Sequence, residues 1–198
     1  MAERSAASGS LAAASGHGAE GDPPAVTANA VVPGAAQMRL LGIRLARLLR
    51  AGDLVVLAGS LGAGKTTLVQ GLGEGLAVRG PITSPTFVIA RVHPSQRGGP
   101  DLVHADAYRL GSRLEVDDLD LDADLDHSVT VVEWGEGLVE DLASGHLRVT
   151  IGWPAPESVV GPGNGPGDEV RIVTVSGYGN RWDDVAGLLR SVLAEPLR

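Results

Sequence analysis

Apolar residues recur at helical spacing in the segment that follows Pro33, and arginines separate them. Gly52 lies just beyond the last of them, where a glycine commonly ends a helix. The pattern therefore predicts an amphipathic helix that leads into the core. Its apolar positions are Leu40, Leu41, Ile43, Leu45, Leu48 and Leu49.

A continuous apolar run, Leu54 to Ala58, comes next and is typical of a strand that is buried on both faces of a sheet. A glycine-rich segment follows it, and Lys65 to about Leu76 again shows a helical pattern. The order is therefore strand, glycine loop, helix.

The rest of the chain alternates further strands with helical or irregular segments, which favours an α/β architecture with a mainly parallel sheet. Residues 147–153 and 169–176 are expected to pair as a C-terminal antiparallel hairpin around a flexible loop of residues 154–168, which is rich in glycine and proline. The other expected strands are Phe87–Val92, Leu102–Ala105 and Val129–Val132. Helix or loop is expected over Gly111–Asp126, and helices up to Leu142 and over Trp182–Leu193.

Composition divides the chain into a tail and one domain. Residues 1–24 are mostly Ala, Ser and Gly, too poor in large apolar groups to offset the entropy of ordering, so we expect a disordered N-terminal tail before a domain of residues 25–198. Cysteine is absent, which excludes disulfides and thiolate chemistry. No apolar run approaches the roughly 20 residues of a membrane span, and we expect a cytoplasmic protein that does not contact the membrane.

The net charge of −8 and seven acids between Glu115 and Asp126 leave no basic face for gripping nucleic acid. The acidic segment is read as solvated, with Leu114, Leu119, Leu121 and Leu125 on its buried side.

The glycine loop satisfies the phosphate-binding pattern G-x-x-x-x-G-K-[ST] in the strand-to-helix context that the pattern requires. Its backbone amides would face phosphate, the only lysine of the chain, Lys65, would reach the β- and γ-phosphates, and Thr66 would ligate magnesium. ATP and Mg²⁺ are thus the expected cofactors, and a three-layer α/β/α P-loop NTPase-like domain is the expected fold. The nucleotide-binding residues predicted are Gly59, Leu61, Gly62, Ala63, Gly64, Lys65, Thr66 and Thr67.

Two acids, Asp106 and Glu133, end predicted strands at the edge expected to face the nucleotide. A P-loop enzyme needs such acids to hold magnesium or place the attacking water, so both join Lys65 as catalytic candidates, with Thr66 and Glu133 as metal candidates. Solvated acids at strand ends are the alternative. The hydroxyl-rich turn Thr83–Phe87 could sense the γ-phosphate as a switch or be an ordinary proline turn.

From about Pro33 to Trp134 the chain resembles the TsaE family, bacterial P-loop ATPases that assist threonylcarbamoylation of the tRNA adenosine next to the anticodon. The resemblance rests on four motifs in order: Gly59-Ser60-Leu61-Gly62-Ala63-Gly64-Lys65-Thr66-Thr67, Ser84-Pro85-Thr86-Phe87, His104-x-Asp106-x-Tyr108-Arg109-Leu110 and Val132-Glu133-Trp134. One departure is Ser60, where the family usually has aspartate.

The resemblance implies roles for individual residues. Ser84 and Thr86 look like the first switch, Asp106 like the acid of the second switch and Glu133 like the other acid of the magnesium site. Trp134 matches a characteristic tryptophan without a derived role. The resemblance also implies a weak, partner-dependent ATPase that works with TsaD and TsaB proteins, with tRNA bound mainly by a partner.

Two alternatives use the same loop differently. A small-molecule kinase would need an arginine-bearing lid, for which Arg91, Arg97, Arg109 and Arg113 are available, although no separate acceptor domain is visible. Residues 180–183 resemble the guanine-reading N-K-x-D motif but lack its lysine, so guanine specificity is not expected.

Overall fold

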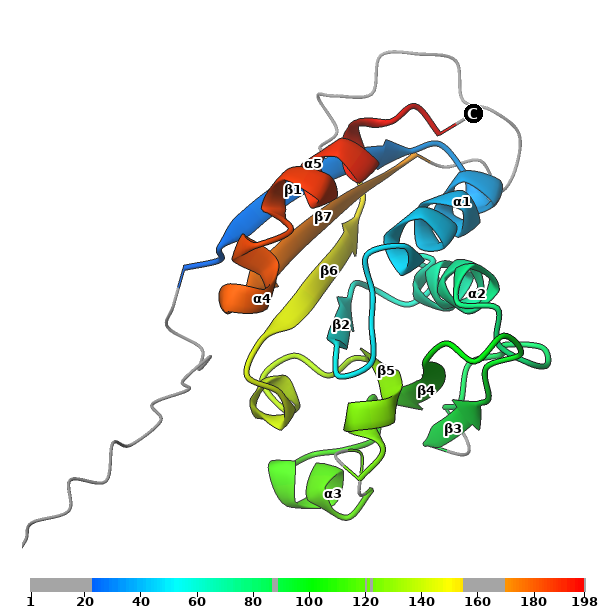
Figure 1. The fold of residues 1–198 in the computed structure, drawn as a ribbon, viewed down its shortest axis with the longest axis vertical. Helices are drawn as coiled ribbons and strands as arrows, with labels where there is room; N and C mark the ends of the chain where they lie inside the picture. Colours follow the sequence, from blue (N-terminus) through cyan, green and yellow to red (C-terminus); the bar gives the residue numbers. More distant parts are fainter. Residues whose placement is uncertain (1–22, 87–88, 120, 122, 155–169, 198) are drawn as a thin grey trace, which may run out of the picture.

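A computed structural model describes residues 23–86, 89–119, 121, 123–154 and 170–197 of the protein. Its centre is a seven-stranded sheet in the order β1-β7-β6-β2-β5-β4-β3 (Figure 1). The strands are β1 (Val26–Val32), β2 (Leu54–Ala58), β3 (Ala90–His93), β4 (Asp101–Asp106), β5 (Ser128–Glu133), β6 (His146–Gly152) and β7 (Arg171–Tyr178).

The sheet is mixed. The four central strands β4, β5, β2 and β6 run parallel, so their carboxyl ends meet at one edge. β7 pairs antiparallel with β6, which confirms the predicted C-terminal hairpin, and β3 is antiparallel to β4 at the other end of the sheet. The parallel centre with helices confirms the α/β, P-loop NTPase-like fold.

The larger apolar core lies under three helices, α1 (Ala35–Ala46), α2 (Lys65–Gly75) and α5 (Ala186–Ala194), on one face of the sheet (Figure 1). α1 and α2 lie side by side with their backbones in contact. The approach is so close that a Cβ on Gly71 would lie 2.0 Å from the Arg39 carbonyl oxygen. The two helices therefore pack closely at this point.

A smaller core lies on the opposite face, where β2, β4 and β5 pack against α3 (Arg113–Asp117) and the segment that follows β5. The predicted acidic segment forms α3 and the 3-10 turn η1 (Leu125–His127), and a second 3-10 turn, η2 (Glu140–Leu142), precedes β6. Leu121 is buried there as predicted, but Leu114 is 76% exposed and Val116 is buried instead. The prediction for Leu114 is wrong because the short helix turns it outward.

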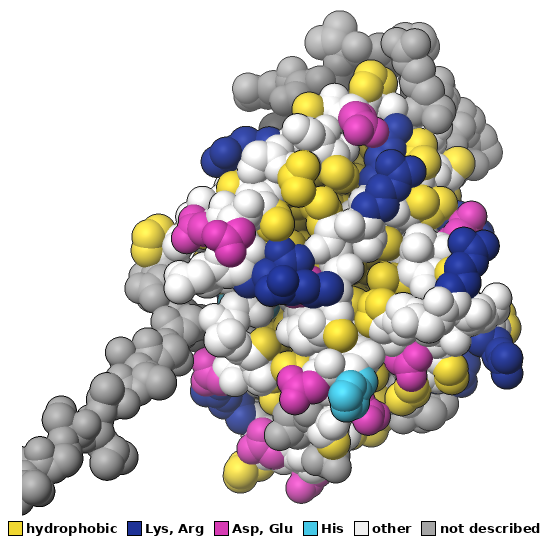
Figure 2. Space-filling view, in the orientation of Figure 1, with side chains coloured by type: hydrophobic (Ala, Val, Ile, Leu, Met, Phe, Trp, Pro, Cys, Tyr) yellow, Lys and Arg dark blue, Asp and Glu magenta, His cyan; other side chains and the backbone are white. Residues whose placement is uncertain are grey.

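Acidic side chains gather toward the lower end of the face in Figure 2, over α3 and the segment after it. Basic side chains on the same face lie mostly higher, over the helices, and form no continuous basic surface (Figure 2). The face shown therefore offers no basic track for nucleic acid.

Two elements differ from the prediction. β1 was not predicted; it pairs antiparallel with β7 along its whole length, at a site that only the distant end of the chain creates. The predicted helix Trp182–Leu193 is divided into α4 (Asn180–Asp183) and α5, because Val185 leaves helical geometry between them. Trp182 is fully buried in the core, which fixes the path of the chain at this point.

Three sequence predictions fall mainly on residues that lie outside the described ones: the N-terminal tail of residues 1–24, the flexible loop of residues 154–168, and the start of the strand predicted at Phe87. The second half of that predicted strand is β3. Within the described ranges no helix has the length and apolar character needed to cross a bilayer.

Candidate functional site

The glycine loop lies between β2 and α2 and depends on three glycines with positive φ: Gly59 at 138°, Gly62 at 77° and Gly64 at 112°. Side-chain-bearing residues adopt such angles rarely. Gly59 is also confined sterically, since a Cβ there would lie 2.5 Å from the carbonyl oxygen of Ile151 on β6. The sequence pattern therefore corresponds to a backbone that needs glycine at these places.

Lys65 opens α2 and turns its ammonium back over the loop. Its Nζ donates to the carbonyl oxygens of Gly59 at 2.8 Å and Ser60 at 3.1 Å, and it lies 3.9 Å from the centre of the Trp134 ring. Burial lowers the pKa of Lys65, while the nearby Glu133 and Asp106 act in the opposite direction. The positive charge is thus held at the loop by carbonyl groups, an aromatic face and two acids.

Trp134 directly follows β5 and has a left-handed backbone, with φ of 60°. Its backbone N–H donates to the Leu57 carbonyl oxygen on β2 at 3.0 Å, and its ring meets that of Tyr108 with centroids 5.3 Å apart. A residue with a bulky side chain adopts this conformation rarely, so its surroundings hold the backbone there. The consequence is an aromatic wall beside Lys65.

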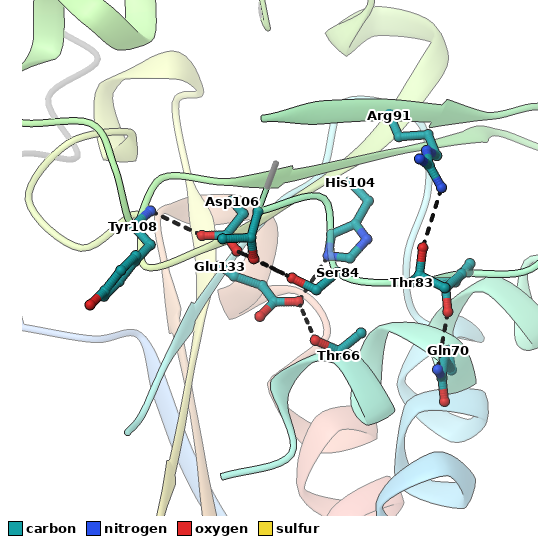
Figure 3. Close-up of polar contacts among 11 residues, drawn as sticks. Thr66, Gln70, Thr83, Ser84, Arg91, His104, Asp106, Tyr108 and Glu133 are labelled. Atoms are coloured by element: carbon teal, nitrogen blue, oxygen red, sulfur yellow. Dashed lines mark hydrogen bonds and ion pairs between the residues drawn. The ribbon is translucent and has the colours of Figure 1, made fainter. Parts of the chain in front are cut away.

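Glu133 is the centre of a buried hydrogen-bond network (Figure 3). Its Oε1 accepts from the Thr66 hydroxyl at 2.9 Å, across from α2, and lies 2.9 Å from Nε2 of His104 on β4. The residue is only 3% exposed and His104 is fully buried. The predicted metal residues Thr66 and Glu133 are therefore in direct contact.

Asp106 connects the hydroxyl-rich turn to the end of β4. Its Oδ2 accepts from Thr86 at 2.5 Å and from Ser84 at 3.3 Å, and its Oδ1 accepts from the Tyr108 backbone N–H at 3.0 Å (Figure 3). Thr83 lies apart from this group and receives a hydrogen bond from Arg91. The three predicted switch residues, Ser84, Thr86 and Asp106, thus form one hydrogen-bonded unit.

These groups surround one cavity of about 270 Å³ at the carboxyl edge of the parallel strands. The predicted residues of the loop and the hydroxyl turn, both acids and Trp134 line the cavity, with two exceptions in the loop. Gly59 lies behind the loop against β6, and Ala63 is buried in the core. The lining comprises Leu61, Gly62, Gly64, Lys65, Thr66, Thr67, Ser84, Thr86, Asp106, Glu133 and Trp134.

The described residues contain no group of three or more His, Cys, Asp or Glu side chains arranged to hold a metal by themselves. Mg²⁺ commonly takes only one or two protein oxygens and completes its octahedron with phosphate oxygens and water. The Thr66 hydroxyl and the Glu133 carboxylate, 2.9 Å apart at the cavity, fit that smaller requirement.

The candidate residues of the small-molecule kinase and of guanine recognition do not lie at the cavity. Of the arginines considered for a lid, Arg91 donates to Thr83 and Arg113 pairs with Asp141, and none of the four lines the cavity. Arg181 of the N-R-W-D sequence pairs with Asp53, which precedes β2, at the end of the sheet opposite the glycine loop.

Sequence reasoning assigned no role to His104, Trp134 or Tyr108. Strand alternation could have found His104, because it lies two residues before Asp106 and therefore on the same face of β4. The contact of Trp134 with Lys65 depends on a left-handed backbone and had no signal in the sequence pattern.

Residues 32–156 match the family model described as Threonylcarbamoyl adenosine biosynthesis protein TsaE. A Streptomyces coelicolor protein named tRNA threonylcarbamoyladenosine biosynthesis protein TsaE is 64% identical over 146 residues, which are 73% of this chain and 93% of the relative. A Mycobacterium bovis protein of the same name is 51% identical over 129 residues, or 62% and 77% of the two chains.

Among solved structures, the crystal structure of YdiB from Bacillus subtilis matches with a TM-score of 0.62 and 25% sequence identity, covering 83% of this chain and 95% of that one. The family match extends over β2 with its loop, Asp106, Glu133 and Trp134, and the loop and these three residues line the cavity. The chain therefore belongs to the TsaE family of threonylcarbamoyl adenosine biosynthesis proteins.

Proposed function

We propose that the protein binds ATP with Mg²⁺ at the glycine loop and hydrolyses it weakly, as an accessory of the machinery that adds threonylcarbamoyl to the tRNA adenosine next to the anticodon. The observation that carries the proposal is the convergence of Lys65, Thr66, Asp106 and Glu133 on one cavity beside a glycine loop. Membership of the TsaE family supports the pathway.

Each residue has a chemical task in this proposal. Lys65 neutralises the β- and γ-phosphates. To reach them, its ammonium group gives up its hydrogen bonds to the carbonyl oxygens of the loop. The Thr66 hydroxyl would coordinate the cation through its oxygen while it donates its hydrogen bond to Glu133. Magnesium, when bound, neutralises the charge that develops on the phosphate oxygens.

Asp106 would couple nucleotide binding to the conformation of the hydroxyl-rich turn. It now receives the hydroxyl hydrogen bonds of Ser84 and Thr86, which a γ-phosphate or its magnesium would compete for. Loss of these bonds would release the turn from the end of β4, which is how a segment ordered by a phosphate acts as a switch. A partner that binds the released turn would sense the nucleotide.

We further propose that the partners are TsaD and TsaB proteins in the cytoplasm, and that tRNA is bound mainly through them. The net charge of −8 supports this division, and the described residues on the face drawn in Figure 2 form no continuous basic surface of the kind that tRNA needs.

A pulldown from native cytosol with and without ATP tests the proposal. Recovery of TsaD-like and TsaB-like proteins, together with faster phosphate release when both are added, is expected. Phosphate release that does not respond to them, combined with rapid phosphorylation of a metabolite, would favour the small-molecule kinase.

A further inference from the structure

His104 lies in β4, between β5 and β3, and its side chain is completely enclosed. Figure 3 shows the ring pointing toward Glu133, with Nε2 2.9 Å from Oε1 of the carboxylate. The strand register places His104 opposite Val131, two residues before Glu133, so the two side chains share one face of the sheet.

The chemistry of the pair assigns the proton. An ionised carboxylate only accepts hydrogen bonds, so Nε2 of His104 carries hydrogen and donates it to Glu133. Nδ1 is buried and has no partner among the described residues. A side chain that only filled space here would be better aliphatic, because an enclosed nitrogen without a partner is costly.

The carboxylate needs such a donor. Oε1 of Glu133 accepts from Thr66 on α2 and from His104 on β4, and Oε2 makes no hydrogen bond to any described residue. Glutamate can rotate about three side-chain bonds, so one hydrogen bond from Thr66 fixes the carboxylate less firmly than two bonds from different elements. The histidine, held inside the sheet, supplies the second of these bonds.

We propose that His104 is a positioning residue: it holds Oε1 of Glu133 so that the carboxylate faces the Thr66 hydroxyl and presents Oε2 to the cavity. The inference rests on the proposed function, because the task of the positioned carboxylate is to support magnesium bound with nucleotide. Groups that orient metal ligands in this way commonly change metal affinity or activity roughly 10–100-fold when removed.

Two amide substitutions provide a matched pair. In His104→Gln the amide nitrogen is as many bonds from Cβ as Nε2 of histidine, so it can donate to Glu133. In His104→Asn the same amide is one bond too short to reach. His104→Leu keeps bulk without any donor and serves as a third variant.

The readout is the affinity for a non-hydrolysable ATP analogue, measured by calorimetry with Mg²⁺ and with EDTA. The increase in affinity with Mg²⁺ is the gain compared between variants. H104Q should keep the gain of the parent protein. H104N and H104L should lose roughly 10–100-fold of it while binding in EDTA stays unchanged, because Lys65 and the loop amides are intact. A merely structural histidine would not separate H104Q from H104N in this way.

If H104N and H104L retain the normal gain, His104 does not position Glu133. A parent protein without any magnesium-dependent gain would instead overturn the proposed function. Nitrogen NMR of the unaltered protein gives a second test, in which H104Q serves only to assign the signals of His104. The ring proton of His104 should be found on Nε2, and a proton on Nδ1 alone would overturn the proposal.

Discussion

Replacing Gly59 by alanine should destabilise the protein more than replacing Gly62 by alanine, although both glycines belong to the same loop. Gly59 has φ of 138° and its added Cβ would lie 2.5 Å from the Ile151 carbonyl oxygen. Gly62 has φ of 77°, but a Cβ there meets no atom within 4 Å. The pair therefore separates backbone strain from steric overlap.

The magnitudes follow from these two observations. A left-handed backbone costs an alanine about 1–2 kcal/mol, and forcing a methyl group against fixed neighbours typically costs about 1–3 kcal/mol more. Gly62→Ala should lower the free energy of unfolding by about 1–2 kcal/mol and Gly59→Ala by about 2–5 kcal/mol. For a chain of this size each kcal/mol is a shift in Tm of about 2–4 °C.

Thermal unfolding and urea titration of both variants and the parent protein measure the difference. Gly52→Ala is the control outside the site, because Gly52 also has positive φ, at 89°, and open space around its Cβ position. It should resemble Gly62→Ala. If Gly59→Ala is as stable as these two variants, the close contact between the loop and β6 does not exist as described.

Further predictions concern charge and access at the site. Glu133→Gln and, separately, Asp106→Asn should leave Tm almost unchanged but lower ATP hydrolysis at least about tenfold, since about 1.4 kcal/mol of lost transition-state stabilisation has that effect; parent-level turnover would make that acid structural. Acylation of Lys65 should be suppressed by a magnesium-bound ATP analogue while labelling of the N-terminal amine stays constant, as peptide mass spectrometry would reveal. Burial lowers the pKa of His146, so the unfolded chain binds more protons and the free energy of unfolding should fall as the pH drops below about 6.5. His146→Phe, which keeps the stack on Tyr178, should reduce that fall in urea titrations at pH 7 and pH 5; an unchanged fall would assign it to other groups.

Most of the fold around the site could be predicted because local patterns and tertiary contacts agree there. β2 coincides with the predicted strand Leu54–Ala58, and α2 begins at Lys65 as predicted. Asp106 and Glu133 end β4 and β5, and the parallel register of the two strands places them opposite each other, as expected for residues at the carboxyl ends of neighbouring parallel strands. Here the local sequence patterns and the contacts between distant segments favour the same structure.

Elements determined by distant contacts were not predictable in the same way. β1 alternates apolar and polar residues only from Val26 to Ala30, a weak signal that becomes a strand only through pairing with β7. Leu114 lies in a helix too short for periodicity to decide which side faces the core. The left-handed Trp134 depends on its hydrogen bond to Leu57, on a strand far back in the sequence.

The same limit applied within the site. Sequence motifs indicated which residues belong to it, but not that Thr66 and His104 meet the same oxygen of Glu133. Such a contact joins α2, β4 and β5, and the register of the strands decides it. Residue spacing along the chain contains no information on that distance.

Calorimetric titration of the parent protein and of Thr66→Ala with an ATP analogue, with Mg²⁺ and with EDTA, tests the central claim most directly. The claim is that the loop and the acids form one magnesium-nucleotide site, in which the Thr66 hydroxyl is 2.9 Å from Glu133. The parent protein should bind more tightly with Mg²⁺, and Thr66→Ala should lose that gain while it retains its affinity in EDTA. Equal magnesium-dependent gains in the two proteins, or no binding by the parent protein, would contradict the claim.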